Sequence, residues 1–579
     1  MVYTLTTMLK CFSKYSFLIM LTIILALSAI LRFPLITTFP PSMVQDEVGL
    51  GYSAISIAQT GMDEWGNKYP IVFKSFGDYK PPAFFYATAL LYKVIGWNFA
   101  LPRLTSAIAG LFVVLFGSFW IRKQFNSDSL SLFGGLLLAI SPWTVHISRM
   151  ALESNLGLAF FMGGLMFLSY AKESKYKLGL SAIFFALSTY SYHGYRFTVV
   201  IFLLALMTTT ILVNIKTIKK ALPDFKTYLF ILLLSSLFSL PGFLSNGATN
   251  RLEQTLLVSS QRSSLEYEHR QNNCYVTFDK LYPSLNKICN IGYNKFTKPV
   301  SIIANSYLDH LSPGFIFFSG DLDAGRNPTQ TGELFLVTLP LWMMGFIFAF
   351  KKYKEYLVIL TGYFVALIPS AVAGEPHSIR MTVLIPFLIA ILVIGYKSFN
   401  KVFKNNVYFK IMTFSLLFIS LGFISLAYLI DTFATHEIDA TYLSYAKKAA
   451  QLSNQYIEDG YTVYADYDLY PEPHIYYAYW NRIDPKITQQ SLKDLVTESE
   501  GFERPTQFGE SLLFKEGKAR SLTCNKEYIK PTVFLTNDPY DIKPQMIITD
   551  NTGSYSEIFV YEMDALREVP QELLSFCNY

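Results

Sequence analysis

Residues 101–145 read LPRLTSAIAGLFVVLFGSFWIRKQFNSDSLSLFGGLLLAISPWTV. Two apolar runs, Leu101–Ile121 and Leu130–Val145, flank a short polar turn that carries Arg122 and Lys123. A helix of roughly 20 apolar residues crosses the hydrocarbon core of a bilayer. The stretch therefore predicts two membrane spans joined by a basic turn.

The whole chain has the composition of a membrane protein. Of its 579 residues, 52% are hydrophobic and 16% are charged, and the mean hydropathy is +0.31. We predict a polytopic α-helical membrane protein with about eleven spans. The predicted spans are Ser16–Leu31, Leu101–Ile121, Leu130–Val145, Leu156–Tyr170, Leu178–Tyr190, Phe197–Val213, Tyr228–Leu244, Leu334–Phe350, Tyr356–Ala373, Met381–Tyr396 and Ile411–Ile430.

The short apolar run Ala83–Ile95 decides the topology, because everything downstream inverts if it crosses the membrane. If it lies on the surface, all the basic clusters between spans fall on the side of Lys10 and Lys14, as the positive-inside rule requires. These clusters are Arg122–Lys123, Lys172–Lys177, Lys216–Lys220, Lys351–Lys354 and Lys397–Lys404. We therefore predict a multi-pass plasma-membrane protein with a cytosolic N-terminus and an extracytoplasmic C-terminus. No cleavage site follows the first run, so the first span is predicted to be retained.

The chain divides into a membrane domain and an outer domain. Residues 1–430 are predicted to form the transmembrane part, with interfacial helices in an outer loop at 32–100 and a functional lid or helical cap at 245–333. Residues 431–579 show a helical pattern at Tyr442–Ile457, followed by strand-like runs separated by turn residues. The strand-like runs are Tyr461–Ala465, Thr532–Leu535, Met546–Thr549 and Ile558–Tyr561. We predict a small extracytoplasmic α/β domain.

Several classes of function are excluded by what the sequence lacks. The net charge of +5 comes from lysines placed between spans, so nucleic acid is not expected as a partner. No Walker motif, dinucleotide fingerprint, zinc-type spacing or nucleophile elbow is present. We therefore expect no nucleotide-driven chemistry and no required cofactor. A divalent metal is compatible with the outer acids but is not predicted.

The five cysteines fall in two compartments. Cys11 precedes the first span, while two pairs, Cys274 with Cys289 and Cys524 with Cys577, lie in segments placed outside. Disulfides form in oxidising compartments, so both pairs are candidate disulfides. Free thiols are an equal alternative.

Ionisable residues gather in the outer loops. Asp46 and Glu47 stand side by side at the start of a predicted interfacial helix, and Glu153 lies in the next outer turn. One of these acids could act as a general base for an acceptor group, with another supporting it. The alternative is structural, with Asp46 as a helix N-cap and Glu47 favourably placed in the first helical turn.

Six cations on the same face suit a phosphate ligand. Arginine offers planar bidentate donors and lysine offers a mobile point charge. Each of these residues alone is more often an interfacial side chain that extends toward water. The candidates are Lys80, Arg103, Arg149, Arg196, His377 and Arg380.

The order of these motifs resembles the family 39 type of GT-C glycosyltransferases, which includes protein O-mannosyltransferases and lipid A aminoarabinose transferases. The resemblance covers about Phe17 to Tyr396 and is most specific in its N-terminal third. It rests on Asp46-Glu47, Lys80-Pro81-Pro82, Leu101-Pro102-Arg103-Leu104, Ser141-Pro142, Ser148-Arg149 with Glu153, and Pro376-His377-Ser378-Ile379-Arg380. In this family the second acid is often Asp, where this chain has Glu153.

The resemblance implies an outward active site that transfers a sugar from a polyprenyl-phosphate donor with inversion. It also implies Asp46 as the base and a phosphate-binding role for Lys80. The acceptor is a protein, a lipid or a glycan. Two other classes are kept as alternatives: a transporter or flippase of lipid-linked sugars, and a non-catalytic membrane scaffold. A transporter would favour internal repeats and charges within the spans, neither of which stands out here.

Overall fold

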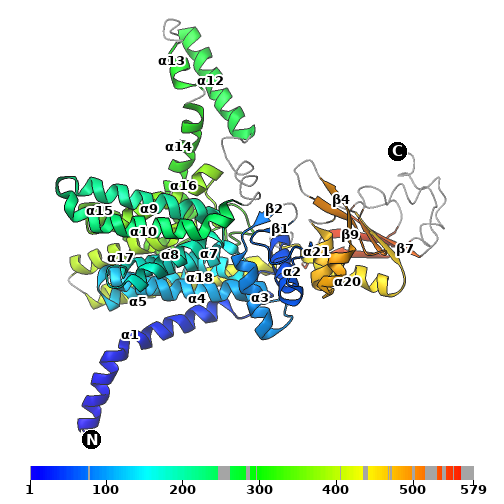
Figure 1. Cartoon of the computed structure of the whole chain (residues 1–579), viewed down its shortest axis with the longest axis horizontal. Coiled ribbons are helices and arrows are strands. Elements are labelled where there is room, and N and C mark those ends of the chain that lie inside the picture. Colours follow the sequence, from blue (N-terminus) through cyan, green and yellow to red (C-terminus); the bar gives the residue numbers. More distant parts are fainter. Residues whose placement is uncertain are drawn as a thin grey trace.

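The computed structural model describes residues 2–75, 78–244, 261–281, 287–294, 297–403, 406–434, 441–466, 469, 472–497, 503–514, 531–537, 543–551, 553 and 555–562. A bundle of apolar helices forms one end of the molecule, and a sheet domain forms the other (Figure 1). Between them lie short elements of the first outer loop. The molecule thus has the predicted form, a polytopic helical membrane protein with a C-terminal α/β domain.

All eleven predicted spans fall on helices. These are α1 (Val2–Arg32), α4 (Leu101–Phe125), α5 (Asp128–Ile140), α7 (Glu153–Ser169), α8 (Lys175–Thr189), α9 (His193–Val213), α10 (Ile218–Phe243), α15 (Leu339–Lys351), α16 (Leu357–Ala373), α17 (Leu384–Val402) and α18 (Val407–Ala434). Within the described residues, five helices are long and apolar enough to cross a membrane alone, and a sixth crossing results if α5 and α6 count as one bent span. The remaining predicted spans coincide with helices that do not meet this criterion over their described residues, so their crossing stays a prediction.

One predicted span is wrong at its outer end. The run Leu130–Val145 is not one straight helix, because α5 ends at Ile140 and α6 (Pro142–Arg149) leaves at an angle of 51°. Pro142 lacks the backbone N–H that would continue the helix, and its ring disfavours helical geometry at the preceding residue. The break turns α6 toward the outer loops.

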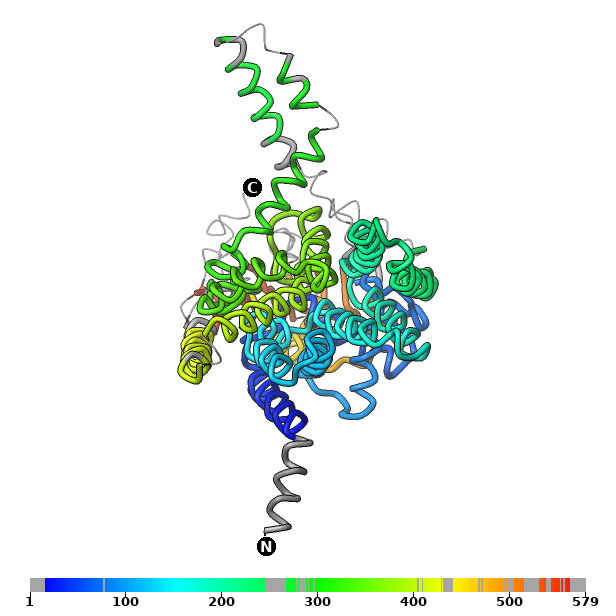
Figure 2. Tube along the Cα trace, turned by 90° about the vertical axis from the view of Figure 1, so that its left-hand side faces the viewer, coloured from blue at the N-terminus to red at the C-terminus, as the bar shows by residue number. Residues whose placement is uncertain are grey.

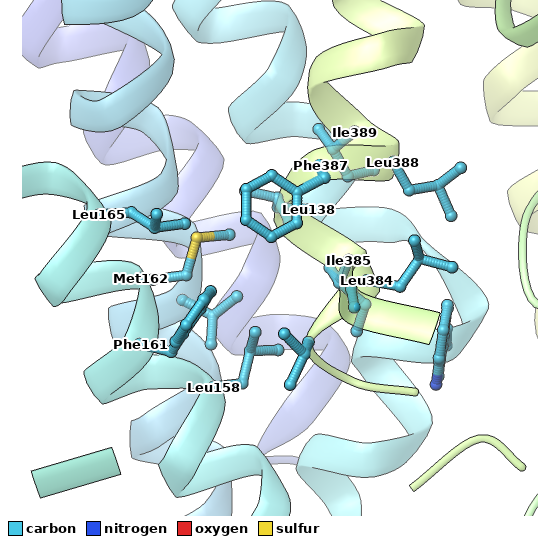
Figure 3. Packing of buried hydrophobic residues seen from close by; sticks show 14 of the residues in the cluster. Leu138, Leu158, Phe161, Met162, Leu165, Leu384, Ile385, Phe387, Leu388 and Ile389 are labelled. Atoms are coloured by element: carbon cyan, nitrogen blue, oxygen red, sulfur yellow. The ribbon is translucent and has the colours of Figure 1, made fainter. Parts of the chain in front are cut away.

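The bundle core lies among α5, α7 and α17. Phe387 of α17 packs between the side chains of Leu138 and of Phe161 and Met162 (Figure 3). Helices α15 and α17 cross closely because each places a glycine at the contact. A Cβ atom at Gly345 would lie 2.1 Å from the carbonyl oxygen of Ile391. Small residues allow such close backbone packing between membrane helices.

The described residues of the first outer loop form two helices and a β-hairpin. Helix α2 (Gln45–Thr60) begins at the paired acids, and α3 (Ala83–Ile95) matches the run predicted to lie on the surface. Between them, β1 (Phe73–Ser75) pairs antiparallel with β2 (Asp78–Lys80). The hairpin places Lys80 at the end of a short ordered strand.

Three helices between α10 and α15 rise away from the bundle as a helical arm (Figures 1 and 2). Its described helices are α12 (Gln261–Leu281), α13 (Lys287–Gly292) and α14 (Thr297–Leu311). A disulfide joins Cys274 to Cys289, whereas Cys524 and Cys577 lie outside the described residues. At the arm's base the Tyr307 hydroxyl donates to the carbonyl oxygen of Phe364 on α16, at 2.8 Å.

The C-terminal domain is built on one mixed sheet of seven strands. The strand order is β4-β5-β6-β3-β7-β9-β8, with β3 parallel to both β6 and β7 and the other pairs antiparallel. The four predicted strand runs correspond to β3 (Thr462–Ala465), β7 (Thr532–Thr536), β8 (Met546–Thr549) and β9 (Ser556–Glu562), and the predicted helix to α20 (Ser444–Glu458). Not predicted were α21 (Pro473–Trp480), α22 (Pro485–Ser491), β4 (Leu492–Thr497), β5 (Glu503–Phe508) and β6 (Leu512–Phe514).

The domain is fastened to the first outer loop by tyrosines. The hydroxyls of Tyr476 and Tyr479, on α21, donate to the carbonyl oxygens of Met43 and Phe99, at 2.9 and 3.0 Å. The ring of Tyr479 packs where a Cβ atom at Gly51 would lie only 2.9 Å away. Helix α2 is therefore held from one side by the C-terminal domain and from the other by the bundle.

Candidate active site

A cavity of about 380 Å³ opens where the first outer loop meets the outer ends of the bundle helices. Its polar wall carries five of the residues predicted from sequence, Asp46, Lys80, Glu153, His377 and Arg380. Its apolar wall is formed by side chains of α9 and α16, among them Phe197, Ile201, Ile368 and Val372. The cavity is thus lined by both polar and apolar side chains.

Asp46 and Lys80 form an ion pair on this wall. The Lys80 ammonium nitrogen lies 2.5 Å from Oδ1 of Asp46. The Lys80 side chain is 8% exposed, whereas that of Asp46 is 57% exposed. An extended carboxylate and a recessed cation therefore meet at the cavity, in a position where both can reach a ligand.

The neighbouring acid, Glu47, is fully buried and bound on both oxygens. Its Oε1 accepts hydrogen bonds from Arg103 Nε and the backbone N–H of Ala151, at 2.9 and 2.7 Å. Its Oε2 accepts from Arg103 Nη2 and the backbone N–H of Val44, at 2.7 and 3.3 Å. Arg103 also donates to three backbone carbonyl oxygens, those of Ile36, Pro40 and Ser42. This pair ties α2, α4 and the turn before Glu153 together behind the cavity.

His193 orders the strand that carries Lys80. Its Nε2 lies 2.7 Å from the carbonyl oxygen of Tyr79, and a carbonyl can only accept, so Nε2 carries the proton. His193 also lines the cavity. The predicted outer turn before Phe197 is in fact the first turn of α9, and this places His193 beside β2.

His377 and Arg380 come from the loop between α16 and α17. Burial, with the positive charges of Arg326 and Arg380, lowers the pKa of His377 to about 3, so its imidazole is neutral at physiological pH. Its Nδ1 accepts from the backbone N–H of Ile379 at 3.2 Å, so the ring proton is on Nε2. A neutral histidine N–H donor and the Arg380 guanidinium thus share the cavity wall with Lys80.

Two acids that were not among the predicted site residues hold this loop in place. Oδ2 of Asp321 accepts from the backbone N–H of Ser378 at 2.9 Å, and Arg326 Nε and Nη2 donate to its two oxygens. Burial would raise the pKa of Asp321, but these hydrogen bonds and the Arg326 charge outweigh it and hold that pKa below its usual value. The Ser378 hydroxyl donates to Oε1 of Glu333 at 2.5 Å. A carboxylate at the edge of an apolar run, as in Glu333-Leu334, is the sequence signal that could have identified it.

Burial also changes the protonation of Glu333. It raises the pKa of this carboxyl to about 8, and the charge of Asp321 adds to the effect.

The carbonyl oxygen of Ser378 accepts from Nε1 of Trp143 on α6 at 3.0 Å. The loop that carries His377 is therefore fixed to both the arm side and α6.

The structure separates the predicted cations into four groups. Lys80, His377 and Arg380 line the cavity with Asp46 and Glu153, while Arg103 is engaged with Glu47. Arg149 lies beside a different cavity and donates to carbonyl oxygens at the end of α1 and in the turn after it. Arg196 donates to the carbonyl oxygen of Thr189 at 3.4 Å, and its Nη2 is buried without a hydrogen-bond partner among the described residues.

No group of three or more His, Cys, Asp or Glu side chains in the described parts of the chain is arranged to hold a metal ion. Asp46 and Glu153 share the cavity wall, but Glu47 is taken up by Arg103. The expectation that no metal is required stays a prediction.

Comparisons with known proteins identify the fold. The chain is similar to ArnT from Cupriavidus metallidurans, both bound to undecaprenyl phosphate and in the apo state, with a TM-score of 0.52 and 11% identity over 96% of this chain and 99% of that one. It is also similar to the apo oligosaccharyltransferase of Archaeoglobus fulgidus, with a TM-score of 0.48 and 13% identity over 81% of this chain and 64% of that one. No family model and no curated protein sequence matches the chain. The expected GT-C architecture is confirmed at the level of the fold.

Proposed function

We propose that this chain, which has the fold of the GT-C membrane enzymes, is a glycosyltransferase that moves a sugar from a polyprenyl-phosphate donor to an acceptor at the outer membrane face. The observation that carries the proposal is the Asp46–Lys80 ion pair on the wall of a cavity shared with Glu153, His377 and Arg380. The undecaprenyl phosphate bound to ArnT supports a lipid phosphate as the class of donor.

The polar side chains that line the cavity suit the phosphate of such a donor, and the apolar ones suit its isoprene chain. Lys80, Arg380 and the Nε2–H of His377 offer positive charge and hydrogen-bond donors to a phosphate. Phe197 and Ile201 on α9, with Ile368 on α16, offer an apolar surface to the first isoprene units. In this arrangement the sugar lies between the phosphate and Asp46.

The proposed reaction is a single displacement at the anomeric carbon. Asp46 takes the proton from the acceptor hydroxyl or amine as the new glycosidic bond forms. The bond between the anomeric carbon and the phosphate oxygen breaks on the opposite side, and its electron pair leaves with the phosphate. The cations of the wall stabilise the negative charge that develops there, as a preorganised electrostatic site. One displacement inverts the anomeric configuration.

We assign different roles to the remaining predicted residues. Glu153 faces the cavity and is placed to bind the acceptor or to support Asp46. Glu47 and Arg103 act as positioning residues, because their hydrogen bonds join the first turn of α2 to the elements beneath the cavity. The Asp321–Glu333 pair has the same kind of role for His377.

We also propose that the cavity faces outward, with the N-terminus in the cytosol. The lysine distribution and the Cys274–Cys289 disulfide, a bond of oxidising compartments, support this orientation. A cysteine at position 124, in a background where Cys11, Cys524 and Cys577 are replaced by serine, should react with a membrane-impermeant maleimide only after cells are opened. Labelling in intact cells would show that the cavity faces the cytosol.

The activity is tested by reconstituting the purified protein in vesicles with a polyprenyl-phosphate-linked sugar and a membrane extract as the source of acceptor. A transferase releases polyprenyl phosphate and yields a sugar-labelled product that mass spectrometry can identify. A flippase would move the lipid-linked sugar across the bilayer with its phosphate bond intact, and a scaffold would do neither. Either of those outcomes would refute the proposal.

A further inference from the structure

A second cavity, of about 270 Å³, lies apart from Asp46 on another side of the bundle. It is bounded by the outer end of α1, by α6, by the loop 326–333 and by α18. Its apolar lining includes Ile30, Leu35, Leu421 and Ile424. Helices α1 and α18 border one edge of the bundle (Figure 2), and α18 is mostly exposed on its outer surface. The cavity is thus placed beside the lipid of the surrounding membrane.

The imidazole of His146 places a buried hydrogen-bond acceptor beside this cavity. His146, 7% exposed, lines the cavity, and its Nε2 lies 3.1 Å from the carbonyl oxygen of Gly325. A carbonyl oxygen can only accept, so Nε2 carries the proton and Nδ1 presents a lone pair. That Nδ1 is buried and has no hydrogen-bond partner among the described residues. It needs a donor from a ligand or solvent, because an unsatisfied buried polar atom is costly.

A second buried polar atom lies beside it. The ring of Tyr428, on α18, stands edge-to-face with His146 at a centroid distance of 5.8 Å. Its hydroxyl is also buried and lines the same cavity, and it lies beside the Arg149 guanidinium, which can only donate to it and so leaves its proton available to a ligand. A single ligand hydroxyl can donate to His146 Nδ1 and accept from Tyr428 Oη, because it carries both a donor and an acceptor.

The charge around the cavity selects further among ligands. Arg149 lines it and donates to the backbone carbonyl oxygens of Leu31, Arg32, Pro34, Leu35 and Phe39, and its guanidinium also lies beside the Tyr428 hydroxyl. Arg32, fully buried below it, donates to carbonyl oxygens and the Thr144 hydroxyl. Neither guanidinium pairs with a carboxylate in the described structure. Glu333 also lines the cavity, but burial raises its pKa to about 8 and keeps it neutral, so the local field is positive. A positively charged headgroup is disfavoured there.

We propose that this cavity is a second lipid site, separate from the donor cavity, for a membrane lipid whose headgroup carries hydroxyls, such as a sugar or polyol. A headgroup hydroxyl bridges His146 and Tyr428, and the acyl chains follow Leu421 and Ile424 into the bilayer between α1 and α18. The proposal does not depend on the catalytic role of Asp46. It assigns to Arg149 a charge at this second site instead of a place at the donor phosphate.

The test places the full-length protein in phosphatidylcholine nanodiscs with trace amounts of three photoactivatable lipids that share one diazirine-bearing acyl chain. Their headgroups are phosphatidylglycerol, monohexosyl diacylglycerol and phosphatidylcholine. Peptide mapping then quantifies labelling of residues 30–35 and 421–428. We expect the two hydroxylated lipids to label these segments roughly tenfold more than phosphatidylcholine, the size expected for a hydrogen bond in a buried site.

Three variants make the outcome specific. Tyr428→Phe should reduce labelling by the hydroxylated lipids to near the phosphatidylcholine level, and Ser425→Phe, which fills the cavity from α18, should reduce labelling by all three. Leu426→Phe, at an exposed position of the same helix, is the matched control and should change nothing. Labelling by both hydroxylated lipids, or by the sugar lipid alone, supports the site and shows which hydroxylated headgroups it accepts. Equal labelling by all three lipids, or a phosphatidylglycerol preference that survives Tyr428→Phe, would overturn it.

Discussion

The ammonium nitrogen of Lys80 lies 2.5 Å from Oδ1 of Asp46, and this contact joins the end of β2 to the first turn of α2. Both elements are held from behind, β2 by His193 and α2 by the Glu47–Arg103 pair. The cavity therefore has a carboxylate and a cation whose backbones are fixed before any ligand arrives. Such preorganisation is what an electrostatic active site requires.

Removing the Lys80 ammonium should weaken use of the donor. In Lys80→Ala the KM for the polyprenyl-phosphate sugar should rise roughly 10- to 100-fold, because a charge-assisted hydrogen bond of about 1.5–3 kcal/mol is lost. Initial rates of polyprenyl phosphate release across donor concentrations give this value. Lys123→Ala is the matched control, since Lys123 pairs with the exposed Glu173 at the other end of the bundle. An unchanged donor KM would remove Lys80 from the phosphate site.

Glu47 should contribute mainly to the stability of the fold and not to the chemical step. Glu47→Gln leaves Arg103 buried without an opposite charge, which typically costs about 3–5 kcal/mol. Unfolding of the purified protein in detergent micelles should show the loss as a large fall in Tm. Asp128→Asn, which breaks the exposed Arg122–Asp128 pair, should shift stability by less than about 0.5 kcal/mol. A fully stable Glu47→Gln protein that lacks activity would instead make Glu47 a catalytic group.

The buried carboxyl of Glu333 should make stability depend on pH. Its folded-state pKa is about 8, against a usual value of 4.5. Between these two values the folded state keeps a proton that the unfolded state has lost, so stability falls as pH rises across this window. The loss is at most about 1.4 kcal/mol per pH unit for a single group. Below about pH 4.5 both states are protonated, and above about pH 8 both are ionised.

Glu333→Gln removes this titration while keeping an oxygen that accepts from Ser378. The Tm of the variant should therefore fall less between pH 5 and pH 8 than the Tm of the natural protein. Comparing the two proteins cancels the contribution of other buried acids such as Glu64, whose pKa is also raised to about 8 by burial. Parallel Tm curves for the two proteins would contradict the assignment of Glu333 as a protonated carboxyl.

Much of the fold could be predicted from sequence because it depends on local patterns. Apolar runs gave the positions of eleven helices, and the alternating runs gave four strands of the outer sheet. The break at Pro142 was missed because hydrophobicity continues through it, although proline at that position is itself the physical cause. Strands β4 to β6 were missed because they are short or polar, and pairing with their neighbours decides their conformation.

The sequence predicted the residue types of the site but not which of these residues lie together. The sequence places acids and cations in outer loops, and five of them meet at one cavity wall. It does not reveal that Glu47 and Arg103 bind each other, because 56 residues separate them along the chain. Nor does it separate Arg149 from Arg380, since a single sequence carries no direct information on which loops share a cavity.

Asp46→Asn tests directly whether Asp46 is the base of the proposed glycosyl transfer. The amide keeps the shape of the side chain but cannot take the acceptor proton. The measurement is polyprenyl phosphate release from a labelled lipid-linked sugar, by purified variant and natural protein of equal Tm, with Asp128→Asn as the control. We expect turnover to fall about 10²- to 10⁴-fold in Asp46→Asn and to stay unchanged in the control. Turnover by Asp46→Asn at the natural rate would contradict that role of Asp46.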